Sequence, residues 1–109
     1  MPWQVILADR AHVDLEENCQ WWAEHRSVEQ AERWYDAFAS AIQSLATTAQ
    51  QHAKARESHR FPFELRQLNF GLGKHPTHRA VYTIRPDMVL VLWIQHLAQA
   101  DLTPDDLRS

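Results

Sequence analysis

Residues 63–96 constrain the fold more than any other part of this 109-residue chain, because they hold three runs rich in β-branched and aromatic residues. A loop at residues 71–77, which carries both glycines of the chain, separates the first two runs, and Pro86 and Asp87 separate the last two. Runs of this kind between turn-forming residues are typical of an antiparallel meander. The pattern predicts three strands, at about residues 63–70, 78–85 and 88–94. The last run is apolar throughout, which indicates a central strand covered on both faces.

The first half of the chain predicts one strand and two helices. A short apolar run at residues 3–7 is typical of a strand that joins the later sheet. From Asp9 the apolar residues recur every three or four positions, which predicts a helix, and Asp14 and its acidic neighbours fall mostly away from that stripe. Ser27 and Gln30 form a capping-box pattern, so a second helix is expected to begin there. Two helices this close in sequence form an antiparallel hairpin whose apolar face covers the sheet.

These elements predict a single α+β domain over residues 1–109. Its N-terminal strand and two-helix antiparallel hairpin are expected to pack with a mostly antiparallel sheet of about four strands, the hairpin covering one face. The acidic end of the chain, residues 101–107, is expected to form one terminal turn anchored by Leu102 and Leu107. We expect one core, formed by the large apolar residues Leu15, Trp22, Phe38, Ile42, Tyr82, Leu90, Leu92 and Trp93.

Several classes of protein and site are disfavoured by the sequence. No apolar run approaches the roughly 18 to 20 residues that span a bilayer, and the first residues lack the basic and apolar regions of a secretion signal. The single cysteine, Cys19, cannot form an internal disulfide, which fits a reducing cytoplasm. His75 and His78 have the closest spacing to a metal-ligand pair, but no second pair accompanies them. We therefore expect a cytoplasmic protein with no membrane contact, no metal and no cofactor.

Charge is segregated along the chain. Residues 1–51 carry three Lys or Arg against eight Asp or Glu, residues 52–85 carry seven against two, and residues 86–109 carry one against four. The middle segment is therefore a basic block of net charge +5. A positive field suits a phosphate backbone or an acidic protein partner, and the alternative is a solvated loop region. The candidate RNA-binding or partner-binding residues in this block are Lys54, Arg56, Arg60, Lys74 and His78.

Three residues in the predicted sheet suit phosphate chemistry. Arg66 and Arg79 lie on neighbouring predicted strands, and a guanidinium can hold a phosphate with two hydrogen bonds or stabilise charge that develops on it. His96 follows the central strand, and its side chain has the right kind of pKa for a general acid or base near neutral pH. The alternative is that Arg66 pairs with Glu64 or with an acidic helix residue and that His96 only caps a strand.

The order of strand, helical hairpin, basic linker and three-stranded meander resembles the RelE/ParE superfamily of bacterial type II toxins, which includes plasmid stabilisation proteins. The similarity spans roughly residues 3–98. Short motifs carry it, namely Asp14-Leu15-Glu16, Ala31-Glu32-Arg33-Trp34, Glu64-Leu65-Arg66-Gln67-Leu68, His78-Arg79-Ala80-Val81-Tyr82, and residues 89–96 with their final Gln95-His96.

The resemblance implies a bacterial toxin that is neutralised by an antitoxin encoded beside it. Members of the superfamily either cut messenger RNA, commonly on the ribosome, or poison DNA gyrase. For a metal-independent RNA-cutting toxin, Arg79 matches the arginine that stabilises the scissile phosphate and His96 approximately matches the acid/base histidine, with Glu64 or Arg66 in support. Gln95 stands where a basic residue is frequent, and residues 97–107 contain no Arg, Lys or Tyr. We expect an mRNA interferase; the alternatives are a gyrase inhibitor and a non-enzymatic interaction module of the same fold.

Overall fold

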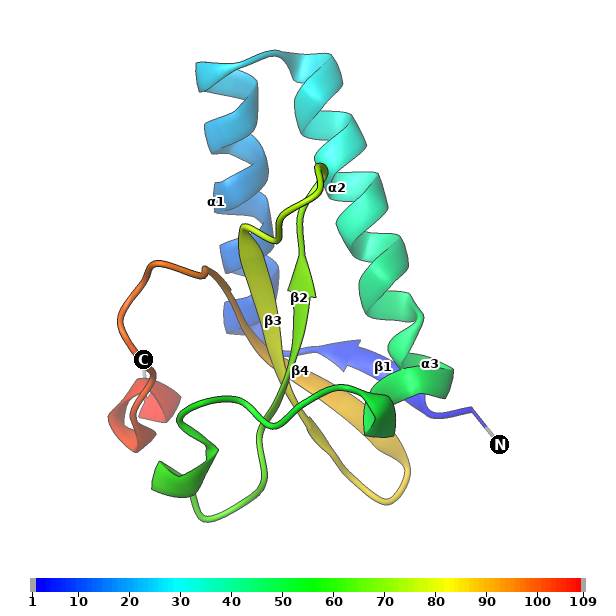
Figure 1. Cartoon of the computed structure of the whole chain (residues 1–109), viewed down its shortest axis with the longest axis vertical. Coiled ribbons are helices and arrows are strands. Elements are labelled where there is room, and N and C mark those ends of the chain that lie inside the picture. The colour runs from blue at the N-terminus through cyan, green and yellow to red at the C-terminus, as the bar shows by residue number, and fades with distance from the viewer. Residues whose placement is uncertain (1, 109) are drawn as a thin grey trace.

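The computed structural model describes residues 2–108 and shows the predicted α+β architecture (Figure 1). Two long helices and a four-stranded sheet form its body, and short helical turns complete it. The elements are β1 (Gln4–Leu7), α1 (Asp9–His25), α2 (Val28–Gln43), α3 (Leu45–Thr48), β2 (Arg66–Phe70), β3 (His78–Ile84) and β4 (Met88–His96), with 3-10 turns at Ala49–Gln51, Ser58–Arg60 and Pro104–Arg108. None of the helices in the described part of the chain is long and apolar enough to cross a membrane.

The sheet has the strand order β1-β4-β3-β2. Strand β1 runs parallel to β4, and the other two pairings are antiparallel, so the meander prediction and the central position of β4 are confirmed. β2 begins at Arg66 rather than near residue 63, because the residues before it bond to other partners. Leu65 accepts a hydrogen bond from the Ala55 backbone N–H (2.9 Å) and donates one to the Ser58 hydroxyl (2.9 Å).

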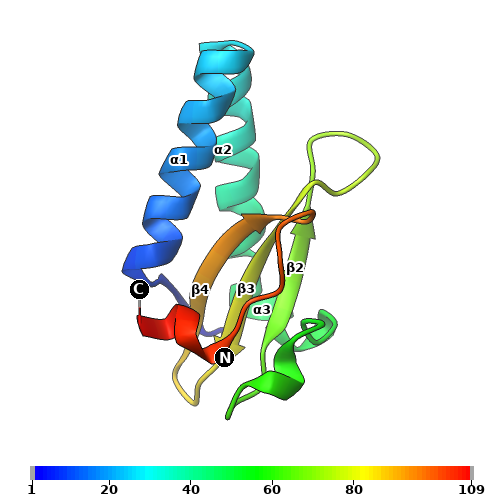
Figure 2. The same cartoon turned by 90° about the vertical axis from the view of Figure 1, so that its left-hand side faces the viewer.

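The two helices form the predicted hairpin on one face of the sheet (Figure 2). The Gln30 backbone N–H donates to the Ser27 hydroxyl (3.0 Å), which confirms the predicted cap of α2. The face of α2 toward the sheet is fully apolar and carries Ala31, Trp34, Phe38 and Ile42. α1 is less simple, because Asp14 is buried instead of solvated, contrary to the sequence expectation.

Asp14 caps the part of β4 that β1 does not reach. Strand β1 pairs with β4 only from Met88 to Val91, which leaves the rest of that edge without a strand. The Ile94 backbone N–H on this edge donates to the Asp14 carboxylate (3.1 Å), and Arg10 forms an ion pair with the same carboxylate (3.0 Å). Burial raises the pKa of Asp14, against the lowering effect of these contacts. A helix side chain therefore takes over a bond that a sheet neighbour would otherwise make.

The expectation of one core is wrong, because the sheet is covered on both faces. The first apolar cluster lies between the helices and the sheet and contains Leu15, Phe38, Ile42 and Tyr82, with Trp22 at its edge. The second lies on the opposite face and contains Ala55, Phe61, Leu65, Val81, Trp93 and Leu102, with Leu92 at its edge. Leu90 is half-buried and belongs to neither set of buried residues.

A β-bulge in β4 decides which side chains reach which cluster. Val81 pairs with Trp93 and Tyr82 pairs with Val91, so Leu92 is an extra residue in β4. Val89 and Val91 therefore face the helices, whereas Trp93 faces away from them. Beyond the bulge, simple alternation along the strand is shifted by one residue.

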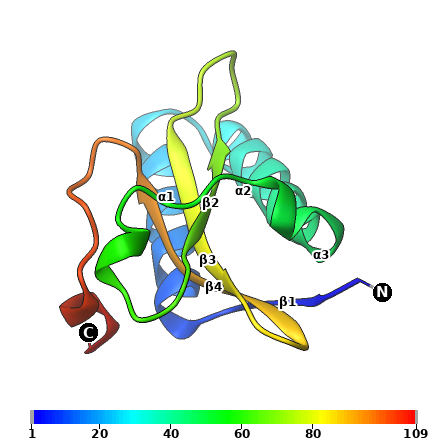
Figure 3. The ribbon, with the colours of Figure 1, turned by 60° about the horizontal axis from the view of Figure 1, so that its bottom comes forward.

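Two irregular segments cover the second face of the sheet, and we call residues 52–65 the linker and residues 97–108 the tail. Figure 3 shows the helices behind the sheet and the linker in front of it, with the tail beside the linker. Leu102 anchors the tail in the second cluster, as predicted, whereas Leu107 is 45% exposed and anchors nothing comparable.

Candidate functional site

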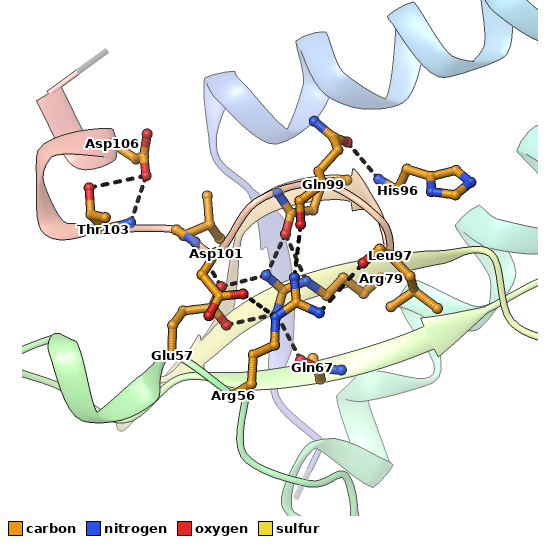
Figure 4. Close-up of polar contacts among 12 residues, drawn as sticks. Arg56, Glu57, Gln67, Arg79, His96, Leu97, Gln99, Asp101, Thr103 and Asp106 are labelled. Atoms are coloured by element: carbon orange, nitrogen blue, oxygen red, sulfur yellow. Dashed lines mark hydrogen bonds and ion pairs between the residues drawn. The ribbon is translucent and has the colours of Figure 1, made fainter.

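Arg79 is the centre of a buried polar network on the linker side of the sheet (Figure 4). The Arg79 side chain has no exposed surface, and its guanidinium forms an ion pair with the equally buried Glu57. The Nη1 and Nη2 atoms of Arg79 donate to the two Glu57 oxygens at 2.7 and 2.5 Å. Nη1 also donates to Gln67 (2.8 Å), and Nε and Nη2 donate to the Gln95 side-chain oxygen. All five N–H donors of the guanidinium are thereby bonded to protein.

Glu57 joins three parts of the chain that are distant in sequence. It belongs to the linker, pairs with Arg79 of β3, and accepts a hydrogen bond from the backbone N–H of Leu102 in the tail (2.8 Å). Burial by itself raises the pKa of Glu57, but the hydrogen bonds from Arg79, Leu102 and its own backbone N–H, together with the Arg79 charge, lower this pKa to about 2. The carboxylate is therefore ionised whenever the protein is folded near neutral pH.

The neighbouring linker residue, Arg56, also holds the tail. Its guanidinium forms an ion pair with Asp101 and donates to the backbone carbonyl oxygens of Gln99 (2.9 Å) and Leu97 (3.5 Å). Arg56 is exposed, whereas Glu57 beside it is buried. Two consecutive residues of opposite charge thus fasten the tail over the second face of the sheet.

His96 lies on the other face of the sheet from Arg79. In the β3–β4 register Arg79 is opposite Gln95, and His78 is opposite His96. The Arg79 side chain points to the linker, whereas the His78 and His96 rings, 5.1 Å apart, lie on the helix side. Arg79 and His96, the two residues to which the resemblance assigns RNA cleavage, therefore lie on opposite faces of the sheet.

The two histidines line an open, mostly apolar cleft of about 360 Å³. The lining residues are Asn18, Trp21, Trp22, Thr77, His78 and His96. His96 is exposed, and its Nδ1 accepts a hydrogen bond from the Ala98 backbone N–H (3.1 Å), so the neutral ring carries its proton on Nε2. Burial, and secondly the neighbouring His96, lower the pKa of His78 to about 4. His78 is therefore a neutral, buried side chain rather than an exposed binding residue.

Arg66 and Glu64 form a third, separate group. Arg66 pairs with Glu64 (2.8 Å) and donates to the backbone carbonyl oxygens of Gln50 (3.2 Å) and His52 (2.5 Å), so it holds the end of the helical segment against β2. This is the alternative that the sequence left open. The four residues proposed for catalysis therefore lie in three places, and only Glu64 and Arg66 are in contact.

The basic block is largely neutralised within the protein. Four of its seven cations form ion pairs, Lys54 and Arg66 with Glu64, Arg56 with Asp101, and Arg79 with Glu57. Both acidic residues of the block, Glu57 and Glu64, take part. Arg60 and Lys74, two of the cations predicted to bind a partner, are exposed. Neither forms an ion pair within the described residues.

Sequence reasoning missed Glu57, Gln67 and Gln95 as members of a site. A signal existed for Glu57, because it is one of only two acidic residues among the nine charged Lys, Arg, Asp and Glu residues of residues 52–85. No comparable signal marked the two glutamines, although Gln95 had been noted where a basic residue is frequent in the superfamily. Within residues 2–108 no group of three or more His, Cys, Asp and Glu side chains is placed to hold a metal ion.

Comparison with known proteins gives a consistent family. A family model described as "ParE toxin of type II toxin-antitoxin system, parDE" matches residues 5–100. A solved structure titled "Chromosomal ParDE TA system from P. aeruginosa" aligns with a TM-score of 0.68 and 17% sequence identity, covering 86% of this chain and 95% of that one. That likeness shows a shared fold. No curated protein sequence gives a significant match. Since the family model covers most of the chain, the protein belongs to the ParE toxin family of type II toxin-antitoxin systems.

Proposed function

We propose that this ParE-family toxin inhibits growth by acting on DNA gyrase and that it does not cleave RNA. The observation that carries the proposal is the state of Arg79. A guanidinium that stabilises a scissile phosphate must offer free N–H donors to it. Those of Arg79 are all bonded to Glu57, Gln67 and Gln95, and the side chain is fully buried.

The position of His96 supports the same proposal. Metal-independent RNA cleavage needs a proton donor or acceptor within hydrogen-bonding reach of the atoms that react at the phosphate. His96 opens into the cleft on the helix side, whereas Arg79 is enclosed on the linker side. One RNA phosphate would have to contact both faces of the sheet at once to use the two residues. Of the two toxic activities known in the superfamily, this leaves gyrase as the better-supported target.

The proposal is tested with the toxin freed from its antitoxin. We expect it to inhibit DNA supercoiling by purified gyrase, and its expression to induce the DNA-damage response while messenger RNA stays intact. The complex with the antitoxin is the control and should be inactive in both assays. Cleavage of RNA by the pure protein in the presence of EDTA would overturn the proposal. Failure to inhibit gyrase together with harmless expression would instead favour an interaction module of this fold.

A matched pair of variants separates the two activities. His96→Gln removes the histidine proposed for acid/base catalysis. We expect this variant to remain toxic if gyrase is the target. His59→Gln, an exposed histidine of the linker, is the control for a surface substitution. Loss of toxicity in a stably folded His96→Gln protein, with His59→Gln unaffected, would show that His96 takes part in the toxic reaction.

Membership of the family implies a cognate antitoxin, and we propose that exposed cations of the basic block contact its acidic residues. Arg60 and Lys74 are the best candidates, since Lys54 and Arg56 already have partners within the toxin. Attraction between exposed charges is screened by salt. The antitoxin should therefore associate more slowly as salt rises, and Arg60→Gln with Lys74→Gln should weaken that dependence. An unchanged salt dependence in the double variant would exclude these two cations.

A further inference from the structure

Side chains of two neighbouring strands form a polar cradle around Arg79 of β3. Gln95 of β4 lies opposite Arg79, and Gln67 approaches it diagonally from β2. The side-chain oxygens of both glutamines accept hydrogen bonds from the guanidinium and fix its orientation. Gln67 is itself held, because its amide donates to the Asn69 side chain (2.9 Å). The sheet thus supplies three of the five hydrogen bonds that position the cation, and Glu57 supplies the other two.

The negative charge that neutralises this cation comes from outside the sheet. Glu57 is in the linker, and the backbone N–H that completes its hydrogen bonding belongs to Leu102 in the tail. Both segments lie over the cradle as a cover (Figure 4). The site therefore divides into a cation fixed by the sheet and an anion delivered by two irregular segments.

A buried guanidinium does not lose its proton, so it requires an anion beside it. Glu57 meets this need by presenting two oxygens to two nitrogens, which is also the way in which a phosphate binds an arginine. We propose that Arg79, Gln67 and Gln95 form an anion-binding site for a phosphate-sized ligand, which this protein keeps closed with its own Glu57 carboxylate. The Glu57–Arg79 pair is thus an internal, self-inhibiting contact.

This inference extends beyond the target of the toxin and does not depend on it. It concerns a site of the isolated protein, whereas the gyrase proposal concerns an external enzyme. The two therefore fail in different assays.

The test is thermal unfolding of the 109-residue chain in inorganic phosphate, compared with chloride at matched ionic strength. Glu57→Ala removes the carboxylate and leaves room for an ion. We expect phosphate to raise the unfolding temperature of this variant in a saturable way, as for any ligand that binds only the folded state. The unaltered protein, whose site is filled, should show no difference between phosphate and chloride. A folded Glu57→Ala protein without a phosphate-specific shift would overturn the proposal.

Three controls identify where the phosphate binds. Glu57→Ala combined with Arg79→Met should abolish the shift, because the cation is gone. Glu57→Gln should abolish or greatly reduce it, because the glutamine fills the space. Glu64→Ala frees the partly buried Arg66 and the exposed Lys54 from their shared carboxylate, and it should give no phosphate-specific shift. An equal shift in any of these three proteins would place the ion elsewhere and contradict the proposal.

The test also works if the loss of Glu57 prevents folding in plain buffer. Phosphate should then restore the folded state of Glu57→Ala, as judged by circular dichroism and a cooperative unfolding transition. It should not restore the folded state of the protein that also carries Arg79→Met. A Glu57→Ala chain that stays unfolded at saturating phosphate would refute the proposal.

Discussion

The two oxygens of Glu57 accept hydrogen bonds from two different nitrogens of Arg79, and both side chains are fully buried. Glu57 precedes Arg79 by 22 residues and Leu102 by 45 residues, so one carboxylate connects linker, sheet and tail. Such a pair is costly to break, because removal of one partner leaves the other charge buried and unpaired. Its contribution to stability should be measurable against that of an exposed pair in the same protein.

Glu57→Gln should lower the free energy of unfolding by about 3 to 5 kcal/mol, since Arg79 loses its counter-ion. Glu64→Gln is the matched control, because it removes a carboxylate that pairs with Arg66 and Lys54 but is 46% exposed. That change should cost at most about 1 kcal/mol. Urea unfolding followed by circular dichroism measures both values. Equal losses for the two variants would show that burial does not distinguish the pairs.

Acid should remove the contribution of the Glu57 ion pair in a defined pH window. The pKa of Glu57 is lowered from 4.5 to about 2 on folding, so the stabilisation is complete above about pH 4.5 and is lost as the pH falls through about 2. At about 1.4 kcal/mol per pKa unit, the difference corresponds to about 3 kcal/mol. The free energy of unfolding, measured between about pH 5 and about pH 2, should fall more steeply for the unaltered protein than for Glu57→Gln. Parallel curves would contradict the assigned shift.

His78 should make the protein lose stability at milder acidity. Burial lowers its pKa from 6.5 to about 4, so the unfolded chain takes up a proton first. Stability from the neutral ring is therefore complete above about pH 6.5 and is lost as the pH falls towards about 4. His78→Gln should flatten the stability curve in this interval, whereas His59→Gln, on the surface, should not. NMR titration of the His78 ring checks the pKa directly.

The two apolar clusters should respond differently to loss of a leucine. Leu65 is completely buried in the second cluster, and Leu65→Ala should cost about 2 to 5 kcal/mol. Leu90 is half-buried and outside the buried set of both clusters, so Leu90→Ala should cost clearly less. Chemical unfolding of the two variants gives the comparison. A larger loss for Leu90 would mean that the linker side of β4 is packed differently.

The loop between β2 and β3 should tolerate a methyl group at only one of its two glycines. A Cβ at Gly71 would lie 2.3 Å from the backbone oxygen of His75, whereas a Cβ at Gly73 would meet no described atom within 4 Å. Gly71→Ala should therefore destabilise the protein by about 1 to 3 kcal/mol, as overpacking does elsewhere. Gly73→Ala should be close to neutral. Thermal unfolding of both variants is sufficient, and equal effects would exclude a close approach at Gly71.

Local patterns predicted the skeleton of this fold well. The capping pair Ser27 and Gln30 marks the start of α2, and the uninterrupted apolar run of β4 marks the centre of the sheet. Both signals arise from residues that are neighbours in sequence, where short-range geometry determines the outcome. The family resemblance, which rested on the order of such elements, is confirmed by the family match over residues 5–100.

The candidate site was harder to predict, because its geometry depends on long-range contacts and on one irregularity. Counting alternate residues back from His96 through β4 places this histidine on the same face as Leu92 and Leu90. The bulge at Leu92 reverses that count, so His96 lies on the helix side with His78. Likewise, no local pattern shows that Glu57, in an irregular linker, lies against Arg79. Alternation predicts the faces of a strand only where its pairing is regular.

The fastening of the tail by Arg56 and Glu57 limits where the protein tolerates a fused tag or reporter. Leu102 belongs to the second apolar cluster and donates a hydrogen bond to Glu57, so the tail contributes to the packing and the polar contacts of the domain. A label attached after the tail would strain the contacts of the tail that cover Arg79. Strand β1 lies on the other side of the molecule (Figures 1 and 3). Labels for toxicity and binding assays therefore belong ahead of β1, where they leave that closure undisturbed.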